Sequence, residues 1–230
     1  MEKAFFIGDV HGCYDELIEL LKLKPDSRKN YYLGDIADRG NNSLGVINHV
    51  YDEFINNQAK LIRGNHCNKV YRYFKGNQVS VNGGIRTTIK ELEKLSEEEQ
   101  QKLKNKFITL YEKGSYYQAF ARNNVIAVHG SWRDDVLNMT NNRDIESVCL
   151  YANASGEKGA DGFPTDWKLN YKGKKTIIYG HIVHEQPYIF NNIYGLDTGC
   201  VHGGHLTGLL FPEMKIIQVK AKDIYFQSKR

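Results

Sequence analysis

The 230-residue sequence has no long hydrophobic run. No stretch approaches the roughly 18 consecutive apolar residues that a membrane-spanning helix needs. The amino terminus passes from Met1-Glu2-Lys3 directly into the short apolar segment 4–7, which is too short for the hydrophobic region of a signal peptide. We therefore expect a cytoplasmic protein without a membrane partner.

Cysteine is also scarce. The four cysteines are far apart and form no CxxC pair. In a chain of this length, such spacing is typical of reduced thiols rather than of a disulfide framework or a zinc knuckle. Redox chemistry is therefore not expected.

A strong excess of one charge is absent as well. The formal net charge is +4, and basic residues alternate with acidic ones, as in Glu91-Leu92-Glu93-Lys94. This pattern lacks the basic face of a nucleic-acid-binding protein but is compatible with an anionic substrate. We expect no stable nucleic-acid complex and a monomer, and we find no internal repeat.

The elements that are present predict an α/β protein. Strand-forming segments at 4–7, 31–33 and 60–62 alternate with helix-forming segments at 14–23, 43–54 and 67–74, which indicates βαβ units. The segments 188–190, 193–196, 206–211 and 215–219 predict a second, mostly antiparallel sheet. With 41% hydrophobic residues, the chain is expected to form one domain over residues 1–230.

Two segments are expected outside the sheets. A helix at 85–95 and a second one opened by Ser96, with Glu99 completing a capping box, predict a small helical cap at about 84–112. Residues 152–174 are rich in Gly, Asp, Asn and Lys and are long for a simple connection. We interpret them as a substrate-facing flap.

Metal-binding side chains follow five predicted strands. The motifs are GDVHG at 8–12, GDIADRG at 34–40, GNH at 64–66, HG at 129–130 and GH at 180–181. A single Asp after a strand is more often a turn former than a ligand. Five such motifs in one chain instead favour a ligand site, because the carboxyl ends of strands are where α/β sheets bind ligands.

The ligand types predict a two-metal phosphoester hydrolase. Two divalent cations can clamp the attacking and leaving oxygens of an in-line displacement at phosphorus and lower the pKa of a water between them. We expect Asp35 to bridge the ions, with Asp9 and His11 on one and Asn65, His129 and His181 on the other. This mixed set of oxygen and nitrogen ligands suits manganese, iron, zinc, cobalt or nickel better than calcium or magnesium. Of these metals we expect manganese.

Four further residues are candidates for catalysis. His66 follows a predicted ligand directly, so its imidazolium can give a proton to the leaving oxygen, and Asp38 can orient it. Arg39 offers a planar fork for two phosphate oxygens, and Arg63 is a second candidate. In the flap, Lys168 and Lys172 are candidate contacts for the substrate beyond the reacting phosphate.

The motifs resemble those of the metal-dependent phosphoprotein phosphatase superfamily of calcineurin-like metallophosphoesterases. GDVHGCYDEL at 8–17, GNHCNKVYRYFKGN at 64–77 and DTGCV at 197–201 are similar to the bacterial PrpE-type bis(5′-nucleosyl)-tetraphosphatases. The resemblance implies a four-layer fold in which two mixed sheets form a β-sandwich flanked by helices. It also implies the ligand, acid and arginine roles above, and a second phosphate-binding basic residue, for which Arg143, Lys168 and Lys172 are candidates.

Three functions remain open at this point. The resemblance favours asymmetric hydrolysis of dinucleoside tetraphosphates, for example of Ap4A to ATP and AMP. The alternative is a protein phosphatase acting on phosphoserine, phosphothreonine or phosphotyrosine, because the same metal site serves both reactions. A non-catalytic binding module is disfavoured because His66, Asp38 and Arg39 are all present.

Overall fold

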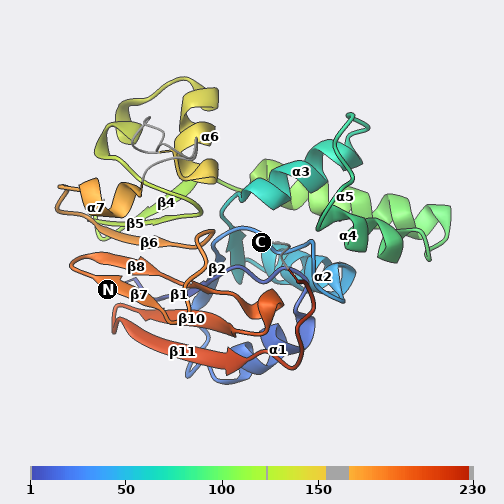
Figure 1. The fold of residues 1–230 in the computed structure, drawn as a ribbon, viewed down its shortest axis with the longest axis horizontal. Helices are drawn as coiled ribbons and strands as arrows, with labels where there is room; N and C mark the ends of the chain where they lie inside the picture. Colours follow the sequence, from blue (N-terminus) through green and yellow to red (C-terminus); the bar gives the residue numbers. More distant parts are fainter. Residues whose placement is uncertain (1, 123, 154–165, 228–230) are drawn as a thin grey trace.

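The computed structural model describes residues 2–122, 124–153 and 166–227 (Figure 1). The chain begins with three strand–helix units, followed by two helices of the cap: β1 (Ala4–Ile7), α1 (Tyr14–Lys22), β2 (Lys29–Tyr32), α2 (Ser43–Ile55), β3 (Ala59–Leu61), α3 (Asn65–Phe74), α4 (Ile85–Leu92) and α5 (Glu97–Lys113). The remaining elements are β4 (Tyr117–Phe120), β5 (Val125–Val128), η1 (Asp134–Asn138), α6 (Asn142–Tyr151), α7 (Trp167–Asn170), β6 (Thr176–Tyr179), β7 (Tyr188–Phe190), β8 (Ile193–Gly195), β9 (Asp197–Thr198), η2 (Cys200–His202), β10 (His205–Phe211) and β11 (Lys215–Lys220).

Two mixed sheets form the centre of the molecule. The first has the order β11-β10-β1-β2-β3, with β9 paired to β10, and the second has the order β4-β5-β6-β8-β7. Strands β1, β2 and β3 are parallel to one another, as are β5, β6 and β8. The parallel strands of each sheet therefore present their carboxyl ends at one edge.

Alternating side chains of β1 separate two hydrophobic cores. Ala4 and Phe6 face the second sheet, and the Phe6 ring meets Phe120 edge-on at 5.1 Å. Phe5 and Ile7 face the opposite way, into the core beneath α1 and α2. Successive strand residues point to opposite faces, so an all-apolar segment such as residues 4–7 is buried on both sides.

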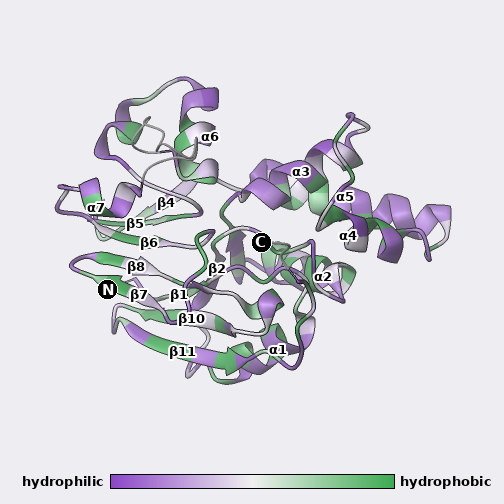
Figure 2. Cartoon of the chain, in the orientation of Figure 1, coloured by the Kyte–Doolittle hydropathy of each residue, from purple (hydrophilic) through white to green (hydrophobic). Residues whose placement is uncertain are grey.

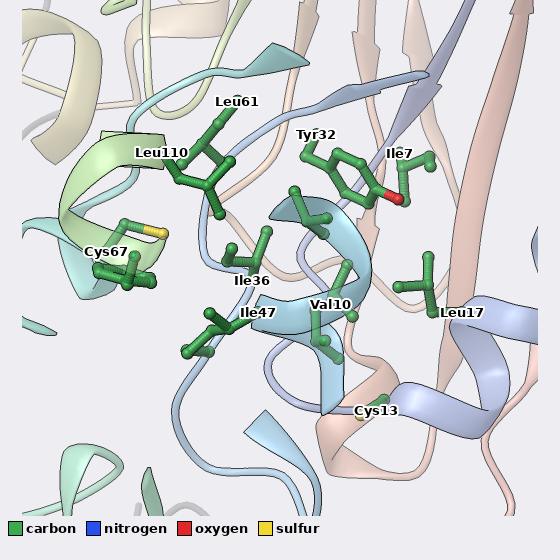
Figure 3. Packing of buried hydrophobic residues seen from close by; sticks show 14 of the residues in the cluster. Ile7, Val10, Cys13, Leu17, Tyr32, Ile36, Ile47, Leu61, Cys67 and Leu110 are labelled. Atoms are coloured by element: carbon green, nitrogen blue, oxygen red, sulfur yellow. The ribbon is translucent and has the colours of Figure 1, made fainter. Parts of the chain in front are cut away.

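Helices cover the outer faces of both sheets. In Figure 3, Ile7, Tyr32 and Leu61 of the first sheet lie with Leu17 of α1 and Ile47 of α2. A third core packs the second sheet against the α6–α7 region and includes the buried Trp132 and Trp167. Hydrophobic residues concentrate in the sheets, and hydrophilic ones on the outer helices (Figure 2). The predicted four-layer sandwich is confirmed.

The predicted helices α4 and α5 form a lobe with α3, at the right of Figure 1. The capping box at the start of α5 is present, because Ser96 accepts from the Glu99 backbone while the Glu99 side chain accepts from Ser96. Within the part of the chain that the structure describes, no helix is both long and apolar enough to cross a bilayer.

The prediction of a separate, mostly antiparallel second sheet was wrong. Of its four predicted strands, β7 and β8 do enter the second sheet, but β10 pairs antiparallel with β1 and β11 pairs with β10 in the first sheet. The buried run 206–211 has apolar residues on both faces, so it fits beside β1 between two cores. The second sheet is mixed because β6 is parallel to both β5 and β8.

Candidate metal centre

The five sequence motifs meet at one edge of the two sheets. Asp9, Asp35 and Asn65 follow β1, β2 and β3, and His129 and His181 follow β5 and β6. All except Asn65 and His181 are at most 4% exposed. The parallel strands thus bring together polar side chains that are far apart in the sequence.

Asp35 lies at the centre of this cluster. Its Oδ1 accepts hydrogen bonds from the backbone N–H groups of His66, at 2.9 Å, and Cys67, at 3.2 Å. Its Oδ2 lies 3.9 Å from Nε2 of His11 and 3.4 Å from Nε2 of His129. One oxygen is therefore held by the protein, and the other faces histidines on two sides, which is the arrangement a bridging carboxylate needs.

His11 and Asp9 lie on the first side. Oδ2 of Asp9 is 3.9 Å from Nε2 of His11, and Nδ1 of His11 is 3.1 Å from the carbonyl oxygen of Ala37. An imidazole that donates from Nδ1 to a carbonyl keeps its Nε2 lone pair for a metal. The Nε2 of His11 is thus an acceptor, as a ligand role requires.

Asn65, His129 and His181 form the second side. Oδ1 of Asn65 lies 2.9 Å from Nε2 of His129 and 3.1 Å from Nδ1 of His181. Nδ1 of His129 lies 2.7 Å from the carbonyl oxygen of Leu33, so its Nε2 is again the atom left for a metal. The possible ligand atoms of Asp35, His129 and His181 all lie within 4.8 Å of one another.

Burial and charge shift the ionisation of these groups strongly. Burial lowers the pKa of His181 to about 3, with a further contribution from His129. Burial also lowers the pKa of His129, but the carboxylates of Asp35 and Asp9 outweigh it and raise the value to about 9. Burial, together with the nearby Asp197, raises the pKa of Asp9 well above its usual range. Bound cations would favour ionised carboxylates and neutral imidazoles here.

The backbone at this edge is held in an uncommon conformation. His11, Asp35, Asp38, Arg39 and His181 have φ values of +46°, +36°, +77°, +70° and +64°. Positive φ is rare for residues with a side chain, and it concentrates at functional sites. Neighbouring glycines permit the close packing, because a Cβ at Gly64 would lie 2.2 Å from Oδ1 of Asp35, and one at Gly180 would lie 2.2 Å from Oδ1 of Asp9.

His66, Asp38 and Arg39 lie beside the ligand cluster. Nδ1 of His66 is 2.9 Å from Oδ2 of the fully buried Asp38. The Arg39 guanidinium lies 2.9 Å from Nε2 of His66 and, through its other nitrogen, 2.9 Å from Nε2 of His11. Because arginine only donates, both Nε2 atoms accept here, and His66 donates from Nδ1 to Asp38.

Two residues near the site were missed at the level of sequence. Thr88 of α4 is fully buried, and its hydroxyl lies 3.1 Å from Oδ1 of Asp38. Asp197 is a buried carboxylate close enough to raise the pKa of Asp9. Asp197 follows β8 and could have been found by the strand-end argument that was applied to the candidate ligands. Thr88 carries no comparable signal, because only the packing of α4 brings it to Asp38.

The structure does not bring Arg63 to the ligand cluster. Its Nε donates to the carbonyl oxygen of Tyr111 at 2.9 Å and its Nη2 to that of Glu112 at 3.1 Å, in the last turn of α5. Its guanidinium also lies over the rings of Tyr111 and Tyr116. Arg63 therefore caps α5.

The predicted flap at 152–174 is only partly described, since residues 154–165 lie outside the described ranges. Lys168 shares a cavity of about 330 Å³ with His181, but its ammonium is 2.7 Å from Asp166 and 5.3 Å from the Tyr188 ring centre. Lys172 is exposed and lines a different cavity, with Trp132 and Tyr171. Lys168 and Lys172 therefore line two different cavities and do not form a common surface within the described residues.

The donor set fits a pair of divalent transition-metal ions. Carboxylate, amide and imidazole groups converge on a small buried volume, and Asp35 is common to the two histidine groups that could hold an ion. Imidazole suits zinc, iron, nickel and manganese sites with mixed ligands better than calcium or magnesium sites, which prefer oxygen alone. The metal-dependent chemistry predicted from the sequence is compatible with this geometry.

Comparisons with known proteins find relatives over most of the chain. A family profile described as calcineurin-like phosphoesterase matches residues 3–185. The bis(5′-nucleosyl)-tetraphosphatase PrpE [asymmetrical] of Bacillus cereus (strain Q1) is 40% identical and is aligned over 94% of each chain. The protein of the same name from Geobacillus sp. (strain WCH70) is 38% identical over 99% of this chain and 98% of its own.

Solved structures share the fold at low sequence identity. The crystal structure of a candidate diadenosine tetraphosphatase has a TM-score of 0.69 and 21% identity and covers 96% of this chain and 95% of its own. A cold-active protein-tyrosine phosphatase from a Shewanella species has a TM-score of 0.59 and 16% identity, over 96% of this chain and 81% of its own. At these identities the likeness shows the fold alone.

Proposed function

The chain belongs to the calcineurin-like phosphoesterase family, and we propose that it is an asymmetric bis(5′-nucleosyl)-tetraphosphatase that cleaves Ap4A to ATP and AMP. The substrate follows from relatives that carry this name and are about 40% identical over nearly the whole chain. The reaction type follows from the family and from one observation, which is that Oδ2 of Asp35 lies between His11 and His129.

We assign Asp9, His11, Asp35, Asn65, His129 and His181 to two divalent ions, with manganese as the proposed native metal. When bound, such ions would supply Lewis acidity and an activated water. The two guanidinium nitrogens that face His11 and His66 would hold two oxygens of the transferring phosphate. Asp38 would stabilise the imidazolium of His66, whose Nε2–H would face the leaving oxygen.

We propose that residues 1–230 act as one domain, that the protein is a monomer and that it works in the cytoplasm without a nucleic-acid or membrane partner. Thr88 supports the one-domain proposal, because a cap helix supplies a contact to Asp38. The alternative function is a protein phosphatase, since the fold is also that of a protein-tyrosine phosphatase.

A comparison of substrates tests the function. The kcat/KM values for Ap4A, a phosphoserine peptide, a phosphotyrosine peptide and p-nitrophenyl phosphate should be measured with Mn²⁺, Co²⁺, Ni²⁺ and Mg²⁺. We expect Ap4A to rank first and chromatography to show equal amounts of ATP and AMP. A higher kcat/KM for either peptide would favour the protein phosphatase, and formation of ADP alone would contradict asymmetric cleavage.

Metal removal tests the class of chemistry. A chelator should abolish hydrolysis of every substrate, and added Mn²⁺ should restore it. The fold should survive, because the three hydrophobic cores do not depend on a metal as a zinc finger does. Circular dichroism before and after chelation checks this, and global unfolding would identify the site as structural.

A further inference from the structure

A polar cavity of about 780 Å³ lies between α3 and α6, beside the metal centre. Its walls include Asn68 and Arg72 of α3, and Arg143, Glu146 and Tyr151 of α6. Tyr151 also lines the neighbouring cavity that contains the ligand His181. A volume of this size is in the range that holds a nucleotide-sized ligand.

One stripe of α3 leads from the metal centre into this cavity. Asn65, Asn68 and Arg72 are spaced by three and four residues, so they lie on the same face of the helix. Asn65 points at His129 and His181, and Arg72 lies about 10 Å farther along the axis at about 1.5 Å per residue. A chain of several phosphates can follow this stripe, whereas a single phosphate cannot.

The charges of the cavity favour an anion. Arg72 and Arg143 form no ion pair with any acid in the described part of the chain, and both side chains are exposed. Among the described residues of the wall the one acid is Glu146, which accepts from Nδ2 of Asn68 at 2.8 Å and from the hydroxyl of Tyr116 at 3.5 Å. Within the described lining, two guanidinium groups without an ion-pair partner therefore accompany one carboxylate that is already hydrogen-bonded.

The cavity on the His181 side is less suited to an anion. Its lysine, Lys168, is already paired with Asp166 at 2.7 Å and packed over two tyrosine rings. Recruiting that ammonium to a phosphate would move a side chain that is only 4% exposed away from Asp166 and from the rings packed against it. The α3–α6 cavity offers its cations without such a rearrangement.

We propose that the α3–α6 cavity binds the phosphates of the substrate that lie beyond the reacting phosphorus, with Arg72 and Arg143 as their contacts. This inference rests on the proposed function, because only a polyphosphate substrate has such groups. It assigns Arg72, on a helix that also supplies a metal ligand, to the recognition of chain length. The nucleoside attached to these phosphates then lies at the outer end of the cavity.

Arginine variants test this assignment. Arg72→Ala, Arg143→Ala and the double variant should be compared with Arg122→Ala, an exposed arginine next to β5 at the end opposite His129. We expect the ratio of kcat/KM for Ap4A to kcat/KM for p-nitrophenyl phosphate to fall about tenfold in each single variant, as for the loss of one charge-assisted hydrogen bond. The ratio should not change in Arg122→Ala.

Inhibition by ATP separates this inference from the proposed function. ATP should inhibit p-nitrophenyl phosphate hydrolysis at constant free metal, and its inhibition constant should rise about tenfold in Arg72→Ala, while that of orthophosphate should rise much less. This result supports the cavity even if wild-type protein does not cleave Ap4A. If the wild-type protein cleaves Ap4A but neither the substrate ratio nor ATP inhibition changes in the double variant, the proposed function stands and the cavity assignment is wrong.

Discussion

Asp35 caps helix α3 through a hydrogen bond of 2.9 Å from the backbone N–H of His66 to its Oδ1 atom. The N-cap position itself is Gly64, which has no side chain to satisfy the first N–H groups of the helix. The same carboxylate directs its other oxygen at His11 and His129. One side chain thus fixes the start of α3, where Asn65 and His66 lie, and faces the proposed metals.

The two oxygens of Asp35 can be tested separately. Asp35→Asn keeps an oxygen that can accept from the His66 N–H but loses the anionic bridge. Metal content should fall, with affinity reduced at least ~10–100-fold, the range seen when even outer contacts of a metal are lost. Activity on all substrates should fall with it. Metal analysis together with kcat/KM checks this, and full metal content with normal activity would contradict the bridge.

Asp35→Ala is the matched comparison for the cap. Both variants remove the charge, but only alanine also removes the acceptor for the α3 N-terminus. The metal-free Asp35→Ala protein should therefore be less stable than metal-free Asp35→Asn by about 1 kcal/mol. Urea unfolding in the presence of chelator measures the difference. Equal stabilities would mean that Asp35 does not cap α3.

The convergence of the strand-end side chains could be predicted because parallel strands impose a simple rule. Asp9, Asp35 and His129 follow short apolar runs, and the carboxyl ends of parallel strands meet at one edge. Thr88 could not be predicted, because its approach to Asp38 depends on how α4 packs. The pairing of β10 with β1 was missed for a similar reason, since an apolar strand does not specify its neighbour.

Arg63 shows how proximity in sequence can mislead. It lies two residues before Asn65, yet its guanidinium caps α5. Arg63→Ala should lower the free energy of unfolding by about 1–2 kcal/mol, because two carbonyl groups lose a charged donor. The KM for p-nitrophenyl phosphate should not rise. Arg122→Ala is the control for charge, and a raised KM with unchanged stability would restore Arg63 as a phosphate contact.

Arg28 links the start of β2 to the β10–β11 turn. Its Nε lies 2.7 Å from Asp26, and its Nη1 lies 2.7 Å from Glu213 and 3.1 Å from the carbonyl oxygen of Phe211. Hydrogen bonds from Arg28 lower the pKa of Glu213 to about 2 and also lower the pKa of Asp26. Arg28→Ala should therefore lower Tm at pH 7 by roughly 2–4 °C.

The decrease in Tm caused by Arg28→Ala should depend on pH, and the pKa shifts give the sign of this dependence. Because the folded-state pKa values lie below the unfolded values of about 4, the stabilisation is present above about pH 4.5 and is lost as the pH falls toward 2. The difference in Tm between wild type and Arg28→Ala should thus shrink between pH 5 and pH 2.5. A difference that stays constant would assign the effect to the Phe211 contact alone.

The role of His66 can be tested through the leaving group. A serine alkoxide leaves poorly and needs a proton, whereas a nucleoside triphosphate or p-nitrophenolate leaves as a stabilised anion. If His66 is the acid, His66→Asn should slow phosphoserine hydrolysis by roughly 10²–10⁴ and should slow the other two reactions much less. Asp38→Asn should give the same order with smaller losses, because Asp38 only orients and stabilises the imidazolium across 2.9 Å.

The contact between Arg39 and His66 makes a second outcome of the His66→Asn experiment possible. Its guanidinium is 2.9 Å from Nε2 of His66, so removing the imidazole also removes a group that positions the arginine. If His66→Asn slows all leaving groups equally while metal content stays full, the main role of His66 is to position Arg39 for the phosphate. Arg39→Lys then discriminates further, since it keeps the charge but loses the fork that binds two oxygens. A loss of equal size for all substrates in both variants would identify the pair as one phosphate-binding unit without an acid.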